Sequence, residues 1–282
     1  MKVFSFLIKE FFYGGHILTV GALAITIITG FLFYLDVSIL QLLPIYFITQ
    51  TIYYFDRYSG LKQDIKTNEK RSKHLKTYLH ILPILITIYL VITILLVLRI
   101  DTIILKLTSL SIMFLGFLYG KYFKGLTKYI YGFKNFFVSI IWIYPVVYTL
   151  MLYSIQPFSY KAILFCIFIF IKSLIIQIYF DIKDLETDRN LKLKTIPILL
   201  GKQKTFLLLL ILSILSNIPL VLGIILQDFP KYFISLVLLN LIEIFIFIKS
   251  KKRLEYYLVI VMSGMYLYLL LILLVGRFIY GI

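Results

Sequence analysis

Acidic side chains gather in two short polar segments of an otherwise apolar chain. We call residues 56–71 the first acidic segment and residues 179–190 the second acidic segment. Of the thirteen acidic residues in the chain, these segments hold seven: Asp56, Asp64, Glu69, Asp181, Asp184, Glu186 and Asp188. Mg²⁺ and Ca²⁺ bind carboxylate oxygens, and Mg²⁺ commonly completes its shell with water and substrate phosphates. The concentration of carboxylates therefore predicts a site for a hard cation beside a membrane.

The aspartates of each segment are spaced so that a helix would bring them to one face. Asp181, Asp184 and Asp188 stand at positions i, i+3 and i+7, and they share a face if the preceding helix continues through them. Three like charges on one face repel each other, so this pattern is unfavourable without a cation. Asp56 and Asp64 are eight residues apart, a little over two helical turns. All five aspartates are therefore candidate metal ligands.

Basic side chains alternate with the aspartates and suit the charge of a diphosphate. Arg57 and Arg71 lie in the first acidic segment, Arg189 lies in the second, and Lys194 follows shortly after it. Arginine and lysine form strong, charge-assisted hydrogen bonds to phosphate oxygens. A single short acidic pattern more often marks a solvated helix end than a site. Two such clusters, each accompanied by arginine and each at the end of an apolar run, favour a site.

Apolar residues dominate the rest of the chain, so membrane helices must position the two segments. The 282 residues are 61% hydrophobic and 15% charged. A helix needs about 20 apolar residues to cross a bilayer, and continuous apolar runs indicate helices rather than a barrel. We predict an all-α, polytopic membrane protein, with about nine transmembrane helices around a central cavity and cytoplasmic capping loops, in a single domain of residues 1–282. The predicted spans are residues 15–35, 37–55, 78–98, 102–120, 135–153, 159–180, 204–226, 231–248 and 255–275.

Lysine and arginine are distributed unevenly between the predicted loops. Most of the 29 basic residues lie in the loops that follow the second, fourth, sixth and eighth spans. The positive-inside rule then places these loops and the N-terminus in the cytoplasm, and the C-terminus outside, for a multi-pass protein of the cell membrane. The net charge of +16 fits this topology and attraction to the lipid bilayer. We expect no nucleic-acid partner, because no soluble domain is present to carry a recognition surface.

Lys172 lies near the middle of the sixth predicted span. A lysine within a membrane is costly and is a functional candidate by default, and Lys172 is nine residues before Asp181, about half a turn away around the helix. Lys172 could face a substrate chamber or pair with another helix, for example at Glu243. The histidines show no metal-ligand spacing, so we expect each to be hydrogen-bonded or exposed: His16, His74 and His80.

The second acidic segment, followed by residues 194–201, resembles the second signature of the UbiA superfamily of intramembrane prenyltransferases. The first acidic segment resembles a variant of the first signature of that family. Residues 134–138, which lead into Trp142, are similar to the family's segment at the start of the fifth span. The nine predicted spans, with acidic segments after the second and the sixth, also match the family's architecture.

The resemblance implies Mg²⁺-dependent transfer of a prenyl group from an isoprenyl diphosphate to a lipophilic or aromatic acceptor. Magnesium would act as a Lewis acid on the leaving diphosphate, and aromatic rings would stabilise the allylic cation. The resemblance gives the aspartates catalytic and metal-binding roles: Asp56, Asp64, Asp181, Asp184 and Asp188. It implies six residues that bind the diphosphate: Arg57, Asn68, Arg71, Lys134, Arg189 and Lys194.

The first acidic segment departs from the family pattern at two positions. The usual signature has asparagine four residues before its leading aspartate and another aspartate four residues after it, where this chain has Ile52 and Gly60. The first cation site would then depend on Asp56, with Asp64 and Asn68 as further oxygen donors. The alternatives are a divergent inactive member, a transporter, or another polytopic enzyme acting on lipid phosphates. The acceptor and the length of the prenyl chain stay open.

Overall fold

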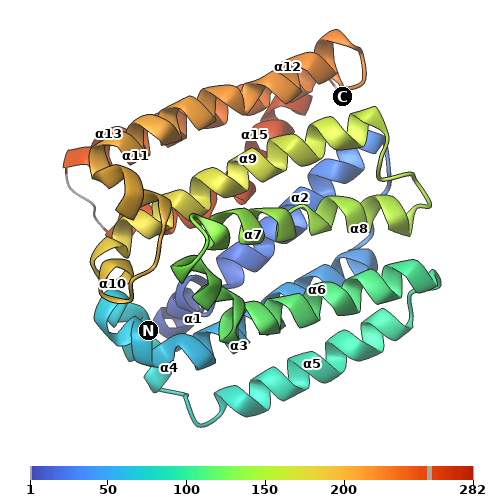
Figure 1. The fold of residues 1–282 in the computed structure, drawn as a ribbon. Helices are drawn as coiled ribbons and strands as arrows, with labels where there is room; N and C mark the ends of the chain where they lie inside the picture. The colour runs from blue at the N-terminus through green and yellow to red at the C-terminus, as the bar shows by residue number, and fades with distance from the viewer. Residues whose placement is uncertain (1, 253–255, 282) are drawn as a thin grey trace. The chain divides into compact units, whose positions relative to one another are not determined.

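A computed structural model of the chain describes residues 2–252 and 256–281, apart from the side chains at positions 2, 62–64, 66, 67 and 256. The described residues form helices joined by turns and short loops, and they contain no strand (Figure 1). The predicted all-α class is therefore confirmed. The chain divides into two compact units, one of residues 1–23 and 37–125 and the other of residues 24–36 and 126–282. Each unit is described separately below, and the single domain stays a prediction.

Long apolar helices make this a multi-pass membrane protein. In the described part of the chain, six helical segments are long and apolar enough to cross a bilayer: His16–Phe33, Ile103–Lys121, Phe133–Leu152, Tyr160–Lys183, Ile196–Ile225 and Lys231–Lys252. A seventh is obtained if Tyr257–Ser263 and Met265–Ile279, which are bent by 58°, form one span. Each of the nine predicted spans falls on a helix or on consecutive helices. Two predicted spans, 78–98 and 37–55, fall on helices outside these seven. Helix α5 (Leu82–Leu98) has only 17 residues, and α3 (Ile39–Thr67) continues into the charged first acidic segment.

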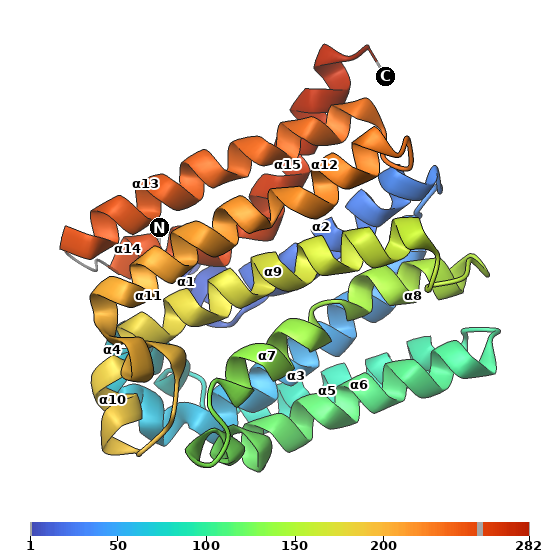
Figure 2. The ribbon, with the colours of Figure 1, turned by 45° about the horizontal axis from the view of Figure 1, so that its top comes forward.

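The first unit is organised around α3. This helix packs against α4 (Glu69–Lys76), α5 and α6 (Ile103–Lys121), and α5 also contacts α6 beside it (Figure 2). Gly116 allows the close approach of α6 to α3, because a Cβ atom at that position would lie 2.7 Å from the side chain of Ile52. The close crossing of α3 and α6 therefore depends on the absence of a side chain at Gly116. Ile52, one of the two departures from the family signature, is used here to pack two helices together.

Two further helices bring the start of the chain into the first unit. Helix α1 (Lys2–Tyr13) packs against α4. Gly15, with a φ of +101°, makes the turn between α1 and α2 (His16–Phe33). Glycine adopts this left-handed conformation without the steric cost that a Cβ atom would bring. Helix α2 begins in the first unit and ends in the second.

The second unit is built around α9 (Tyr160–Lys183), whose side chains from Ser173 to Ile176 are all buried. Helix α9 packs against α7, α11 and α12 (Figure 1). Ser159 caps its first turn by accepting a hydrogen bond from the backbone N–H of Ala162 at 3.3 Å, as N-cap serines commonly do. The remaining elements are η1 (Phe123–Lys128), α7 (Phe133–Ile141), α8 (Tyr144–Leu152), α10 (Leu185–Asn190), α11 (Ile196–Leu215), α12 (Asn217–Ile225), η2 (Lys231–Leu238), α13 (Leu239–Lys252), α14 (Tyr256–Ser263) and α15 (Met265–Ile279).

Candidate active site

The aspartates of the second acidic segment lie on two helices rather than one. Asp181 is in the last turn of α9, Asp184 separates α9 from α10, and Asp188 is in α10. The helix does not continue through the segment, because Asp184 has non-helical backbone angles (φ −93°, ψ 9°). The i, i+3, i+7 face is therefore interrupted at its middle member. The carboxylate of Asp184 instead forms an ion pair with its neighbour Lys183 at 2.8 Å.

Lys134 joins the two outer aspartates. Its Nζ lies 2.8 Å from Oδ1 of Asp181 and 2.9 Å from Oδ2 of Asp188. The Nδ2 group of Asn135 donates a hydrogen bond of 2.9 Å to Oδ2 of Asp181. Asp181 and Asp188 are each only 4% exposed, so little water is available to solvate their charges. One ammonium group faces two carboxylates, which leaves this buried group of charges net negative and suited to a further cation.

Backbone hydrogen bonds hold Lys134 beside the second acidic segment. The N–H of Gly132 donates to the carbonyl of Lys194 at 2.9 Å, and the N–H of Lys194 donates to the carbonyl of Thr127 at 2.8 Å. Gly132, with a φ of +63°, is the N-cap of α7, and glycine tolerates this conformation. The loop before α7 is thus tied to the loop after α10. This pairing fixes the start of α7, where Lys134 and Asn135 lie.

The other predicted diphosphate ligands of the second unit lie apart from this buried group. The ammonium of Lys194 lies 4.7 Å from the centre of the Tyr131 ring, a cation–π contact. Arg189 follows Asp188 directly and is exposed. The structure therefore joins Lys134 to the carboxylates, while Arg189 lies in the last turn of α10 and Lys194 lies in the loop that follows α10.

The first acidic segment is arranged differently. Asp56 lies in α3, its side chain is 36% exposed, and its Oδ2 is 3.2 Å from Nη1 of the adjacent Arg57. Helix α3 runs to Thr67, so Asp56 and Asp64 belong to one continuous helix as their spacing predicts. The side chain of Asp64 is outside the described part of the structure. Asn68 is buried and is the N-cap residue of α4, in which Arg71 lies.

The Nε group of Arg57 donates a hydrogen bond of 3.2 Å to the carbonyl of Tyr13, at the end of α1. The Arg57 guanidinium also lies 5.6 Å from the centre of the Tyr53 ring. The orientation of this predicted diphosphate ligand is therefore set by the N-terminal helix. The two acidic segments belong to different units, so their approach to one another stays a prediction.

The residues of the second unit fit Mg²⁺ if they supply part of its coordination shell and water and substrate supply the rest. Among the described residues, no group of three His, Cys, Asp or Glu side chains forms a ready metal site. However, Oδ1 of Asn135 is buried and accepts no hydrogen bond, and buried polar atoms normally have a partner. Mg²⁺ commonly takes only one or two carboxylates and fills its shell with water and substrate oxygens. Asp181, Asp188 and the Asn135 amide oxygen meet that requirement.

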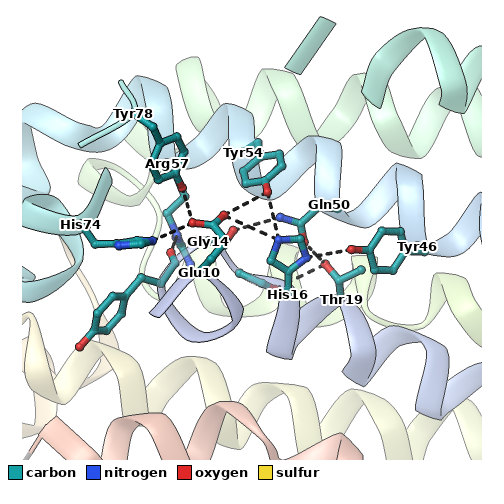
Figure 3. Close-up of polar contacts among 12 residues, drawn as sticks. Glu10, Gly14, His16, Thr19, Tyr46, Gln50, Tyr54, Arg57, His74 and Tyr78 are labelled. Atoms are coloured by element: carbon teal, nitrogen blue, oxygen red, sulfur yellow. Dashed lines mark hydrogen bonds and ion pairs between the residues drawn. The ribbon is translucent and has the colours of Figure 1, made fainter. Parts of the chain in front are cut away.

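Two residues with central contacts in the structure were not predicted from the sequence, Asn135 and Glu10. Asn135 lies in the stretch that resembles the family, but it carries no charge and no role was predicted for it. Glu10 was not considered, although it is the first of the acidic residues and stands just before the first predicted span. Glu10 proves to be the centre of a polar cluster in the first unit (Figure 3).

The intramembrane lysine has a structural partner. Nζ of Lys172 lies 2.9 Å from both carboxylate oxygens of Glu243 and 2.8 Å from Oδ1 of Asn240. Ser213 of α11 also donates a hydrogen bond to Glu243. Of the two alternatives for Lys172, the pair with Glu243 is therefore the one found. This network joins α9, α11 and α13.

The comparisons with known proteins identify the family. The family model described as the UbiA prenyltransferase family matches residues 64–255, which is more than half of the chain. The chain therefore belongs to the UbiA prenyltransferase family. A search of curated proteins finds no match.

Solved structures show the same fold. A UbiA homolog from Aeropyrum pernix K1 matches with a TM-score of 0.73 and 14% identity, over 94% of this chain and 98% of that chain. A UbiA homolog from Archaeoglobus fulgidus bound to GPP and Mg²⁺ matches with a TM-score of 0.68 and 15% identity, over 95% and 99%. A digeranylgeranylglyceryl phosphate synthase matches with a TM-score of 0.61 and 17% identity, over 99% and 98%. At these identities the likeness is one of fold, and membership of a prenyltransferase family supports prenyl transfer as the activity.

Proposed function

We propose that this protein transfers a prenyl group from an isoprenyl diphosphate to a lipophilic or aromatic acceptor in the membrane, with Mg²⁺ as cofactor. The single observation that carries the proposal is the convergence of Asp181 and Asp188 on Lys134. Buried like charges are costly unless cations compensate them. An arrangement that keeps two buried carboxylates beside one ammonium is suited to binding a metal together with an anionic substrate. Family membership supports the same reaction.

Three side chains would hold the metal in the second unit: Asp181, Asp188 and Asn135. When bound, Mg²⁺ supplies Lewis-acid stabilisation of the negative charge that develops on the diphosphate. The hydrogen bond from Asn135 to Asp181 orients that carboxylate, and such supporting contacts matter for metal affinity. Asp184, Asp56 and Asp64 remain predicted ligands of the metal.

Basic side chains of the chain would stabilise the leaving group. The bond between C1 of the prenyl group and the diphosphate oxygen breaks, and its electron pair leaves with the diphosphate. Preorganised cationic donors lower the energy of that developing charge. C1 then bonds to a nucleophilic atom of the acceptor, which loses a proton. We assign the diphosphate contacts to Lys134, Arg57, Asn68, Arg71, Arg189 and Lys194.

We also propose that the acidic segments lie at the cytoplasmic face of the cell membrane and that residues 1–282 work as one domain. The support is the concentration of lysine and arginine in the loops that carry these segments. Isoprenyl diphosphate would then reach the site from the cytoplasm with its chain in the bilayer. Labelling of a cysteine introduced at the exposed Lys128, in a variant with Cys166 replaced, would report the side of the membrane.

The experiment that tests the function measures diphosphate release by the purified protein in lipid nanodiscs. Isoprenyl diphosphates of several lengths are supplied with Mg²⁺ and a panel of acceptors, and mass spectrometry identifies the prenylated product. We expect Asp181→Asn and Asp188→Asn to lower the rate about 100-fold or more, because each removes charge from the group that holds metal and substrate. Glu186→Gln is the matched control, since Glu186 is an exposed carboxylate in α10, and its rate should change less than about twofold.

Undiminished release in both aspartate variants would remove this group from the mechanism. Wild-type protein that releases no diphosphate from any isoprenyl donor would contradict prenyl transfer itself. Uptake of labelled substrate into vesicles, without any product, would indicate a transporter instead.

A further inference from the structure

Glu10, a carboxylate outside both acidic segments, accepts three hydrogen bonds from other helices and turns of the first unit. Glu10 lies near the end of α1, and its side chain is 14% exposed. Its Oε2 accepts a hydrogen bond of 2.6 Å from the Tyr78 hydroxyl and one of 2.8 Å from Nε2 of His74. Its Oε1 accepts a hydrogen bond of 3.0 Å from the Tyr54 hydroxyl. Figure 3 shows these side chains pointing at the carboxylate from α3 and from the end of α4.

His16 closes the network on the other side. Its Nε2 lies 3.0 Å from the Tyr54 hydroxyl and its Nδ1 lies 2.9 Å from the Tyr46 hydroxyl. Tyr54 donates its proton to Glu10, so its oxygen can accept a hydrogen bond from Nε2 of His16. Nε2 of His16 also lies 3.7 Å from Oε1 of Glu10. We call Glu10, His16, Tyr54, His74 and Tyr78 the Glu10 cluster.

The charge of Glu10 persists at neutral pH. Burial, the largest influence, raises the pKa of the Glu10 carboxyl, but hydrogen bonds from the other members of the Glu10 cluster outweigh burial and lower the pKa to about 2. Hydrogen bonds to an ionised group are stronger than those between neutral groups. The cluster therefore forms a firm contact between α1 and the other helices of the first unit.

The backbone after Glu10 is held to α3 as well. The carbonyl of Tyr13 accepts the hydrogen bond from Arg57, and the carbonyl of Gly14 accepts one of 3.1 Å from Nε2 of Gln50. Gln50 in turn accepts a hydrogen bond of 2.7 Å from Thr19 at the start of α2. The residues that follow Glu10 thus contact α3 at Gln50 and at Arg57, which are about two helical turns apart (Figure 3).

Helix α4 needs an external support of this kind. It has eight residues, Glu69–Lys76, of which only Ser72, His74 and Leu75 are buried. Helices this short are not stable alone in water, so contacts with the rest of the protein must hold them. The ring of Phe6 on α1 lies 5.0 Å from the ring of His74 and 5.9 Å from that of Tyr78. Together with the Glu10 carboxylate, α1 supplies the support.

We propose that Glu10 is a positioning residue, which fixes α4 and the adjacent turn of α3 so that Arg57, Asn68 and Arg71 keep their places for the substrate diphosphate. The cluster affects Arg57 through the Tyr13 carbonyl. Asn68 is the N-cap of α4, Arg71 lies in its first turn, and His74 lies in its last turn. This proposal rests on the proposed function for its consequence in catalysis. The contact itself can be tested without any turnover.

The first test measures local opening of α4 by trypsin under native conditions. Cleavage after Lys70, Arg71, Lys73 and Lys76 is followed by mass spectrometry, because cleavage inside a helix reports how often it opens. We expect Glu10→Gln to accelerate this cleavage about 10-fold, the effect of losing hydrogen bonds to a charged acceptor. Tyr78→Phe removes one hydrogen-bond donor to Glu10 and keeps the ring. It should accelerate trypsin cleavage less than Glu10→Gln does, and it replaces Glu10→Gln in this test if that variant does not fold. Glu69→Gln is the matched control, because Glu69 is 70% exposed and pairs with Lys73 one turn away in the same helix.

The second test measures the consequence for the site. We expect Glu10→Gln to raise the KM for isoprenyl diphosphate about 10-fold with kcat changed less than about twofold, because diphosphate ligands are displaced while the metal-binding aspartates are intact. Glu10→Asp, which keeps the charge on a shorter side chain, should recover part of the loss. Binding of inorganic diphosphate with Mg²⁺, measured by calorimetry, should weaken by the same factor.

The outcomes separate the two proposals. Unchanged trypsin cleavage in both Glu10→Gln and Tyr78→Phe would overturn the role of Glu10 as an anchor. Faster cleavage with unchanged KM and unchanged diphosphate binding would overturn its role in positioning the site. A wild-type protein without turnover contradicts the proposed function, and the cleavage and calorimetry results then decide the role of Glu10 alone.

Discussion

The two acidic segments neutralise their charges in opposite ways. In the second, Asp181 and Asp188 are buried and share the ammonium of Lys134, which comes from another helix. In the first, Asp56 is half-exposed and pairs with its sequence neighbour Arg57. The less exposed carboxylate of Glu10 lies outside the segment. In the second acidic segment, the carboxylates are therefore fixed by direct contact with Lys134. In the first acidic segment, the basic side chains are fixed indirectly, through the Glu10 cluster and the backbone of the N-terminal helix.

This difference matches the departures from the family signature. Ile52 packs against Gly116, so the side chain at that position joins helices instead of presenting a polar group. A Cβ atom at Gly60 would have no neighbour within 4 Å, so that position contributes nothing to the segment. We infer that the second acidic segment contributes most of the metal binding and that the first contributes most to the diphosphate. Four predictions test this comparison.

Removal of Lys134 should have the largest effect. Lys134→Met leaves Asp181 and Asp188 buried without their shared cation, and losing one partner of a buried ion pair costs about 3–5 kcal/mol. We expect a loss of that size in the free energy of unfolding, measured by denaturant titration in detergent. Lys128→Met, at an exposed loop lysine, is the control and should change stability by less than about 0.5 kcal/mol. Adding Asp188→Asn to Lys134→Met should restore part of the stability; no recovery would mean that Lys134 does not compensate that carboxylate.

The Glu10 cluster should show an acid-dependent contribution to stability. The pKa of Glu10 is lowered from 4.5 to about 2, so its contribution is complete above pH 4.5 and is lost as the pH falls toward 2. Linkage gives that contribution a size of about 3 kcal/mol. We expect the difference in Tm between wild type and Glu10→Gln to shrink between pH 5 and pH 3. A difference that stays constant over this range would show that the Glu10 charge does not stabilise the fold.

A methyl group added at the α3–α6 crossing should lower the stability of the protein by a smaller amount. Gly116→Ala places a Cβ atom 2.7 Å from Ile52, and overpacking of this kind costs about 1–3 kcal/mol. Ile52→Ala should relieve the clash in the double variant, as measured by Tm. Gly120→Ala is the control in the same helix, because its nearest neighbours would be 3.7 Å away. Equal destabilisation by both glycine substitutions would contradict a specific contact at Ile52.

The smallest effects on stability should be at the exposed end of the first acidic segment. Asp56→Asn removes a partly exposed ion pair, which is worth less than about 1 kcal/mol, so Tm should change little. Gly60→Asp restores the family's carboxylate in open space, and glycine within a helix is already unfavourable by about 0.5–1 kcal/mol. We therefore expect unchanged or raised stability and a lower Mg²⁺ concentration for half-maximal diphosphate release. A higher Mg²⁺ requirement would contradict a metal-binding role for this segment.

Hydropathy predicted the helices of this fold because the bilayer requires long apolar runs, and each predicted span falls on a helix or a helical pair. The pairing of Lys172 with Glu243 could be anticipated as one alternative, because isolated charges in a membrane need a partner. The break of the helix at Asp184 could not be anticipated, since no glycine or proline marks it in the sequence. Contacts such as Glu10 with His74 and Tyr78 span more than 60 residues, and no local pattern in the sequence predicts which distant side chains meet.

The candidate site was also predictable only in part, because it too depends on contacts between residues far apart in the sequence. The aspartates stand out because their charge is unusual in an apolar chain. Lys134 was indicated only by resemblance to the family, and its position between Asp181 and Asp188 depends on the backbone pairing of two loops about 60 residues apart. Asn135 carries no charge, so nothing in its local sequence distinguished it from other polar residues near helix ends.

The most direct test of the central claim is a structure of the protein in lipid nanodiscs with Mn²⁺ in place of Mg²⁺ and an unreactive thiodiphosphate analogue of the substrate. The account predicts a cation bound by Asp181 and Asp188, with the diphosphate of the same ligand also contacted by Arg57 or Arg71. A cation bound elsewhere, or a diphosphate that touches residues of only one acidic segment, would contradict it.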